Sequence, residues 1–183
     1  ADSSECKEFT RMAYALSEQF DTPVILRLST RISHSQGLVE LQDREEVALK
    51  PYEKNIAKNV MMPGNAIKRH VVVEERMQKL LAFAETTELN KVELNNDKIG
   101  VITSGAAYMY AKEALGDRVS YLKLGMVYPL PDVLIRDFAA KHEKVYVIEE
   151  LDPVFEEHIK ALGVEVIGKE AFTLLGEYTP AMI

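Results

Sequence analysis

Apolar side chains at the spacing of one helix face open the chain. Residues 2–20 are predicted to form an amphipathic helix, with Asp2 as a suitable N-cap. Its apolar side carries Phe9, Met12, Leu16 and Phe20. Residues 21–23 include a proline and are expected to end the helix, and the apolar run at 24–28 is predicted to be a buried strand. A helix and a strand without earlier partner strands indicate the end of an α/β domain whose body is missing.

The next stretch of the chain lacks a clear periodicity. Residues 29–37 are predicted to form a polar corner, and residues 38–69 show the spacing of neither a helix nor a strand. Such a long irregular stretch is unusual inside one compact domain, so we expect a linker that wraps a neighbouring domain. A helix is predicted from His70 onwards, and residues 95–97 are predicted to be a second polar break.

From residue 98 onwards, strands and helices alternate regularly. Strands are predicted at residues 99–103, 119–124, 145–148 and 164–167. Helices are predicted at residues 106–115, 132–141 and 153–162. Asp132 and Asp152 are expected to cap the second and third helices, and Gly116 and Gly163 are expected to end the first and third. This order predicts an α/β fold with a three-layer, open, mostly parallel sheet, preceded by a helix–strand remnant and a linker.

The composition is that of a globular protein, and it narrows the range of partners. Hydrophobic residues make up 47% and charged residues 28% of the 183 residues, and the formal net charge is −7. An acidic surface repels phosphate backbones, so nucleic acid is not expected as a partner. No apolar run approaches the roughly 20 residues that span a bilayer, so a membrane is not expected as a partner either.

Cysteine usage favours a reducing compartment. Cys6 is the single cysteine, so an internal disulfide is impossible and a cytoplasmic location is expected. One cysteine cannot hold an iron–sulfur cluster or a cysteine-rich zinc site. Cys6 is expected to be a semi-buried residue on a helix face. Because the chain starts at Ala1 rather than at a methionine, we expect it to be a piece of a longer protein.

Ser104 and Gly105 are the first candidates for a binding site. They follow a predicted strand and precede a predicted helix, where backbone N–H groups and the helix dipole can hold an anion. The chain lacks the spaced glycines of a dinucleotide fingerprint and the Gly-Lys-Ser/Thr of a Walker loop. A tight turn that starts the helix is therefore the simpler interpretation.

Acidic residues form the second candidate group. Glu149 and Glu150 follow the predicted strand at 145–148 and would lie at the edge where open α/β sheets bind ligands. Paired carboxylates there could bind a metal ion or perform acid–base chemistry. Solvated loop acids, next to a capping aspartate, explain the same residues structurally.

The polar corner supplies the third candidate group. Arg31, Ser33 and His34 lie close together in a predicted loop, and polar loop residues often serve function. Hydrogen-bonded turns or contacts with a neighbouring domain explain them as well. None of the histidines has the spacing of a zinc motif, so a metal site is not predicted.

An ordered set of short sequence words resembles a known family. The words lie at residues 21–27, 30–35, 68–70, 73–76, 102–105, 122–131 and 147–153. In this order they resemble the middle of the large subunit of indolepyruvate ferredoxin oxidoreductases, over nearly the whole chain. The resemblance implies that residues 1–37 end a thiamine diphosphate pyrimidine-binding domain and that residues 38–92 form a linker with one helix. It implies a domain similar to the transketolase C-terminal domain at residues 93–183.

The resemblance also implies cofactors and partners for the parent enzyme. Such an enzyme decarboxylates indolepyruvate and related arylpyruvates oxidatively to acyl-CoA, using thiamine diphosphate, Mg²⁺, 4Fe–4S clusters and coenzyme A as co-substrate. Its partners would be the remaining domains of the same subunit, a smaller second subunit and ferredoxin. The pyrophosphate-binding signature and cluster cysteines of the family are absent from this sequence, so no catalytic, cofactor-binding or metal residue is assigned to it.

The role expected for this piece is structural, without activity of its own. Exposed apolar patches are expected near residues 24–28 and on the helix that carries Phe9 and Met12, where partner domains are missing. Two alternatives stay open. The chain could be the C-terminal domain of another thiamine diphosphate enzyme, such as the β-type subunit of a 2-oxoacid dehydrogenase, or a free-standing α/β binding module.

Overall fold

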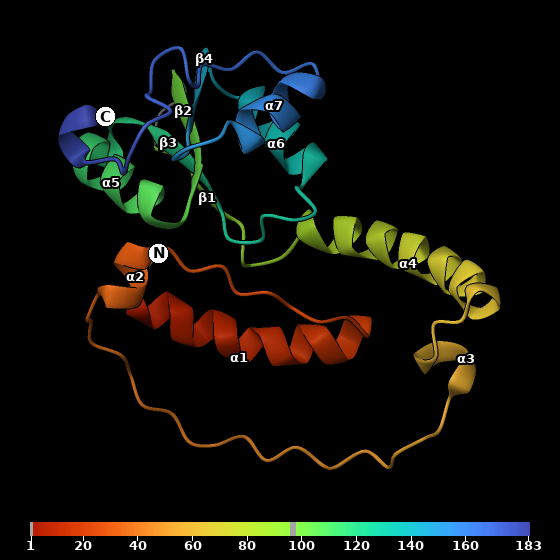
Figure 1. The fold of residues 1–183 in the computed structure, drawn as a ribbon. Helices are drawn as coiled ribbons and strands as arrows, with labels where there is room; N and C mark the ends of the chain where they lie inside the picture. The colour runs from red at the N-terminus through yellow and green to blue at the C-terminus, as the bar shows by residue number, and fades with distance from the viewer. Residues whose placement is uncertain (1, 96–97) are drawn as a thin grey trace.

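A four-stranded sheet forms the centre of the C-terminal half (Figure 1). The computed structural model describes residues 2–95 and 98–183, so Ala1 and residues 96–97 of the predicted polar break lie outside the described residues. The strand order is β1-β3-β2-β4. β2 pairs in parallel with β3 and β4, whereas β1 pairs antiparallel with β3 at the edge. The bounds are β1 Lys91–Glu93, β2 Ile99–Ser104, β3 Ser120–Leu124 and β4 Lys144–Ile148.

Helices cover both faces of this sheet. α5 (Gly105–Leu115) lies on one face, while α6 (Asp132–Ala139) and α7 (Val154–Ala161) lie on the other. Neighbouring residues of β3 show this division, because Leu122 packs in the core under α6 and α7 and Tyr121 packs in the core under α5. The predicted three-layer, open, mostly parallel α/β fold is confirmed. Two 3₁₀ helices complete the C-terminal half, Gly116–Arg118 and Pro180–Met182.

The N-terminal half consists of helices joined by extended chain (Figure 1). α1 (Ser3–Phe20) begins where the sequence predicts, because the Asp2 carboxylate accepts a 2.8 Å hydrogen bond from the backbone N–H of Glu5. Residues 35–55 contain no helix or strand. This segment is tied to α1 by exposed ion pairs, among them Lys50–Glu18 and Arg11–Glu45. The other helices are α2 (Thr30–His34), α3 (Ile56–Asn59) and α4 (Pro63–Ala84).

Two of the predicted strands do not form. Residues 24–28 have no partner strand among the described residues, and Ile25 is 88% exposed. A strand needs a neighbour for its backbone N–H and C=O groups, and an apolar pattern cannot supply that neighbour. Residues 164–167 make a single parallel bridge, between Tyr146 and Ile167. Conversely, β1 was not predicted from the sequence, because three residues are too few to show a periodicity.

Two predicted boundaries in the N-terminal half are also wrong. The polar corner at 29–37 contains α2, where the Ser29 hydroxyl accepts a hydrogen bond from the backbone N–H of Ile32. α4 begins at Pro63 rather than near His70, because proline fits the first position of a helix. The irregular stretch therefore ends at residue 55, and α3 begins at Ile56.

α6 is capped from a distant part of the chain rather than by the predicted aspartate. The carboxylate of Glu85, just after α4, accepts hydrogen bonds from the backbone N–H groups of Val133 and Leu134. Asp132 pairs instead with Nε2 of His158 at 2.7 Å. A carboxylate from another helix supplies the same charge and the same acceptors as a local cap.

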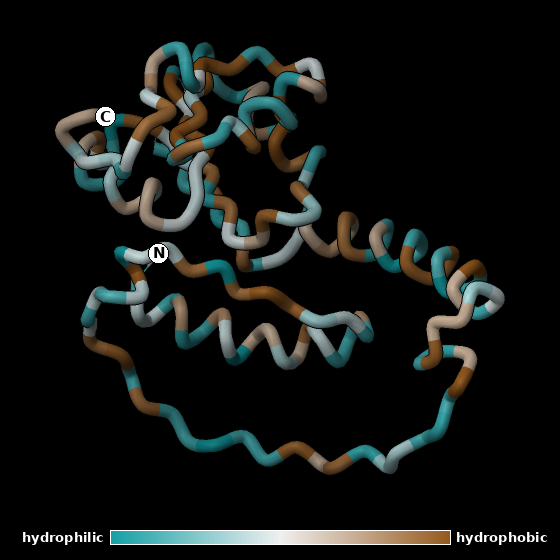
Figure 2. Tube along the Cα trace, viewed as in Figure 1, coloured by the Kyte–Doolittle hydropathy of each residue, from teal (hydrophilic) through white to brown (hydrophobic). Residues whose placement is uncertain are grey.

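Apolar side chains are exposed along the extended segment between α2 and α3, where Figure 2 shows several hydrophobic stretches. Leu38, Leu41 and Leu49 are each more than nine-tenths exposed. The predicted exposure of residues 24–28 is confirmed. On the helix that carries Phe9 and Met12, no described residue is buried, and these two side chains are partly exposed. Among the described helices, none is long and apolar enough to cross a membrane.

Candidate functional site at the carboxyl edge of the sheet

The three parallel strands end together at one edge of the sheet. We call residues 104–105, 124–125 and 148–150 the carboxyl edge. Here the buried Thr103 hydroxyl donates a 2.7 Å hydrogen bond to the backbone oxygen of Ile148 and holds β2 to β4. Ligands of open α/β sheets bind at this kind of edge, so its polar groups are the first candidates for function.

Ser104 and Gly105 form the turn from β2 into α5. Gly105 is exposed and has a φ of +52°, in the left-handed region that favours glycine. Ser104 is the N-cap residue of α5, but its side chain makes no capping hydrogen bond. The positive φ of Gly105 fits the tight-turn interpretation.

Glu149 is buried at the end of β4 and caps α7. Its two carboxylate oxygens accept 2.9 Å hydrogen bonds from the backbone N–H groups of Phe155 and Glu156. Burial raises the pKa of Glu149, although these hydrogen bonds and the charge of Lys169 act in the opposite direction. Asp152, the predicted cap of this helix, is exposed and does not cap it. The buried glutamate reaches the free N–H groups because β4 ends directly beneath them.

Glu150 anchors the C-terminal segment. Its carboxylate accepts a 2.8 Å hydrogen bond from the backbone N–H of Tyr178, whose ring is buried. The Tyr178 hydroxyl donates to the backbone oxygen of Thr173 at 2.7 Å. Lys169 Nζ donates both to that hydroxyl and to the backbone oxygen of Glu149. The acidic pair therefore holds α7 and the C-terminal segment against the sheet.

Arg31 is brought to the same edge from α2. Its guanidinium pairs with the carboxylate of Glu177, and both side chains are about half exposed. The hydrogen bond to Glu177 and the charge of that carboxylate raise the pKa of Arg31. The Ser33 hydroxyl donates back to the backbone oxygen of Ser29, and His34 is exposed at the end of the helix. Arg31 is thus the residue of the polar corner that the structure places next to the carboxyl edge.

A second polar group lies on the α5 face of the sheet, and the sequence interpretation missed it. Lys123 of β3 has a side chain that is only 9% exposed. Its Nζ pairs with the Glu5 carboxylate and lies 4.7 Å from the centre of the Tyr108 ring. The Tyr108 hydroxyl donates to Glu93, which also accepts a 2.7 Å hydrogen bond from Lys112. A lysine inside an otherwise uncharged strand is the sequence signal that could have found this group, because lysine is rarely buried without an acidic partner.

The buried polar groups of this region satisfy one another. In the described part of the chain, no buried side-chain nitrogen or oxygen lacks a hydrogen-bond partner. Over the same residues, no three His, Cys, Asp or Glu side chains are placed to hold a metal ion. One cysteine cannot supply the four thiolates of a 4Fe–4S cluster. The donor groups of residues 2–95 and 98–183 therefore do not fit a metal ion, and the single cysteine does not fit an iron–sulfur cluster.

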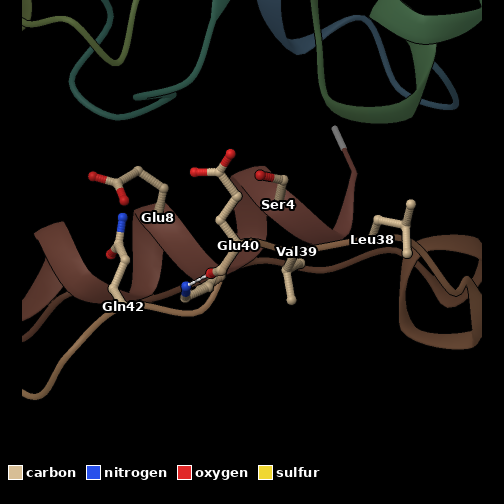
Figure 3. Close-up of a pocket in the computed structure, with 7 residues that line it drawn as sticks. Ser4, Glu8, Leu38, Val39, Glu40 and Gln42 are labelled. Carbon is tan, nitrogen blue, oxygen red and sulfur yellow. Dashed lines mark hydrogen bonds between the residues drawn. The ribbon is translucent and has the colours of Figure 1, made fainter.

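A surface hollow lies between α1 and the extended segment (Figure 3). The extended segment forms one of its walls. A hydrogen bond from Lys7 Nζ to the backbone oxygen of Glu40 joins this segment to α1. Glu8 pairs with Arg11 on the same helix. Because Lys7 and Glu8 serve these contacts, we interpret the hollow as a gap between helix and segment. Its lining residues are Ser4, Lys7, Glu8, Leu38, Val39, Glu40 and Gln42.

Sequence comparison finds relatives along almost the whole chain. The indolepyruvate oxidoreductase subunit IorA of Archaeoglobus fulgidus is 36% identical over 171 residues, or 90% of this chain. The IorA subunits of Methanothermobacter marburgensis and Thermococcus kodakarensis are 38% and 35% identical over 89% and 96% of it. The chain is homologous to a segment of IorA. The resemblance expected from the ordered sequence words is thereby confirmed.

The match covers only part of each relative. The chain spans 27% of the length of the Archaeoglobus fulgidus subunit and 30% of that from Thermococcus kodakarensis. No protein-family model matches the chain. A solved structure of the 2-oxoglutarate:ferredoxin oxidoreductase from Magnetococcus marinus, with 2-oxoglutarate, coenzyme A and succinyl-CoA bound, aligns with a TM-score of 0.51. That alignment covers 67% of this chain and 22% of the other at 23% identity, so it shows a shared fold.

Proposed function

We propose that this chain is part of the large subunit of an indolepyruvate ferredoxin oxidoreductase, in which it has a structural role. The observation that carries the proposal is the similarity to IorA, which extends over 90% of the chain but only 27% of the relative. The fold shared with an oxidoreductase for another 2-oxoacid supports it.

The proposed parent enzyme decarboxylates indolepyruvate or a related arylpyruvate oxidatively. The acyl group passes to coenzyme A as a thioester, carbon dioxide leaves, and the electrons reduce ferredoxin. Bound thiamine diphosphate with Mg²⁺ would supply carbanion stabilisation, and iron–sulfur clusters would carry the electrons. The donor groups described above do not fit the metal ion or the clusters, so we assign these to other domains of the subunit and to a smaller second subunit.

The role that we assign to this chain is to buttress those domains. We propose that residues 1–37 end the pyrimidine-binding domain and that residues 93–183 form the transketolase C-terminal-like domain. Residues 38–92 would be the linker between these two domains. Because β1 pairs with β3, residues 91–92 at the end of the linker also join the sheet of the last domain. The exposed apolar residues at 24–28 are a surface that we expect the other domains to cover.

Anaerobic assay of the longer polypeptide, produced together with its second subunit, tests this proposal. We expect coenzyme A-dependent reduction of ferredoxin with indolepyruvate. The 183-residue chain alone serves as the matched comparison, and we expect it to show no turnover and no calorimetric binding of thiamine diphosphate with Mg²⁺.

Two results would overturn the proposal. Turnover of a 2-oxoacid by the longer polypeptide with a lipoyl acceptor, and none with ferredoxin, would indicate a 2-oxoacid dehydrogenase. Saturable binding of a nucleotide or flavin by the 183-residue chain would indicate a free-standing binding module.

A further inference from the structure

We infer that α1 is a detachable lid over the end of β3, and that the ion pair between Glu5 and Lys123 sets its closed position. The lid comprises α1 and the extended segment tied to it. The inference concerns the chain by itself and does not depend on the proposed enzyme activity.

The first support is the environment of Lys123. Its side chain and that of Glu5 are 9% and 14% exposed, so the pair is largely removed from water. Burial lowers the pKa of Lys123, and the neighbouring Lys91 acts in the same direction, while Asp2 and Glu93 oppose them. A buried ammonium needs a specific counter-charge, and the nearest one, Glu5, comes from the first turn of α1.

The second support is a close approach between α1 and the glycine that follows β3. A Cβ atom at Gly125 would lie 2.9 Å from the Phe9 ring and would clash with the backbone oxygen of Leu89. The side chain of Asn90 accepts 3.0 Å hydrogen bonds from the backbone N–H groups of Gly125 and Met126. The glycine at the end of β3 therefore leaves room for the Phe9 ring, and α1 covers this end of the strand.

The third support is the weak attachment of the rest of α1. None of the described residues of this helix is buried. At its far end, Phe20 contacts Phe83 edge-to-face, with ring centres 5.4 Å apart. Asp21 there faces Lys58, Arg69 and Arg76 from a half-exposed position. Exposed ion pairs and few buried contacts are typical of segments that open locally while the core stays folded.

The largely desolvated pair therefore decides the position of the lid more than its net stability. A buried ion pair contributes little when intact, because desolvation offsets the attraction, but removing one partner leaves an uncompensated charge. Opening of the lid would expose the carboxyl edge at β3, including Lys123, where open α/β sheets bind ligands. The closed lid would keep that part of the edge dry.

Cys6 gives a built-in reporter, because it is the single cysteine and is half-buried beside Glu5 on α1. The experiment measures the rate at which a thiol reagent labels Cys6 in the 183-residue chain, at one pH and temperature. Lys123→Met and Glu5→Gln each remove one partner. Glu18→Gln is the control, because it removes the exposed pair with Lys50 from the same helix.

We expect Lys123→Met and Glu5→Gln to raise the labelling rate more than about tenfold, and Glu18→Gln to change it less than about twofold. Amide hydrogen exchange in β2 and β3 should stay slow in the Glu5→Gln variant, which alters the lid and leaves the sheet intact. If Lys123→Met unfolds the sheet, Glu5→Gln alone decides the outcome. Unchanged labelling in Glu5→Gln, or labelling that rises only together with exchange in β2 and β3, would overturn the inference.

Discussion

The carboxylate of Glu85 accepts a 2.8 Å hydrogen bond from the backbone N–H of Leu134, a residue 49 positions further along the chain. Its other oxygen accepts a 3.0 Å hydrogen bond from the backbone N–H of Val133. The end of α4 is thereby fixed to the start of α6. One side chain both caps a helix and joins the N-terminal half to the sheet.

Replacement of Glu85 should therefore weaken the fold measurably. We expect Glu85→Ala to lower the free energy of unfolding by about 0.5–2 kcal/mol, because α6 loses its cap. Glu85→Gln keeps one good hydrogen-bond acceptor, so its free energy of unfolding should lie between those of Glu85→Ala and the unchanged chain. Urea denaturation followed by circular dichroism measures both. Glu88→Ala, at an exposed position nearby, is the control, and an equal loss there would contradict the capping role.

Removal of the Glu149 carboxylate should have a larger effect, because the cap of α7 is buried. In Glu149→Ala, the N–H groups of Phe155 and Glu156 lose their acceptors, so we expect a loss of about 1–3 kcal/mol. Glu149→Gln should recover part of this loss. The same denaturation measurement applies, with Glu143→Ala as the exposed control. A loss below about 0.5 kcal/mol in Glu149→Ala would show that water replaces the cap.

Glu93 gives a pH-dependent prediction. Burial acts to raise the pKa of Glu93, but hydrogen bonds from Lys112 and Tyr108 outweigh it, and the pKa is lowered. Burial and the hydrogen bond to Glu93 raise the pKa of Tyr108 to about 12. Because the folded pKa of Glu93 is depressed, its carboxylate stabilises the fold above the ordinary value of about 4.3. That stabilisation is lost as the pH falls through the lower, folded value.

We expect Glu93→Gln to lower the free energy of unfolding by about 0.5–1 kcal/mol at pH 7, a modest value because the pair is partly solvated. As the pH falls below the folded pKa of Glu93, the variant and the unchanged chain should converge in stability. Urea denaturation at several pH values tests this, with the exposed Glu113→Gln on α5 as the control. A constant difference across this range would show that the carboxylate charge contributes nothing.

Gly125 and Gly64 differ in the space around them, so replacing each by alanine tests the close approach at Gly125. Gly125→Ala places a methyl group against the Leu89 backbone oxygen and the Phe9 ring, so we expect a loss of about 1–3 kcal/mol. Gly64 lies near the start of α4, where a Cβ atom would meet nothing within 4 Å. Gly64→Ala should therefore be neutral or stabilise the chain by up to about 1 kcal/mol. Thermal denaturation compares the two, and a similar loss in both would contradict the close approach at Gly125.

The sequence by itself determined the α/β alternation of the second half. The predicted strand at 99–103 and the structure's β2 (Ile99–Ser104) agree to one residue, because apolar periodicity is a local property. The sequence also predicted helix ends from local signals. Asp2 caps the start of α1, and Gly116 and Gly163 have positive φ values just after helix ends. The similarity to IorA also rests on the sequence alone, with 36% identity over 171 residues.

Only the tertiary structure decided how the candidate residues are used. Glu149 became a helix cap, Glu150 an anchor for Tyr178, and Arg31 a partner of Glu177, 146 positions away. The pairing of Lys123 with Glu5 spans 118 positions, and residues 24–28 lack a strand partner among the described residues. Periodicity reports which face of an element is buried. It cannot report which distant group meets that face, because that depends on how the whole chain packs.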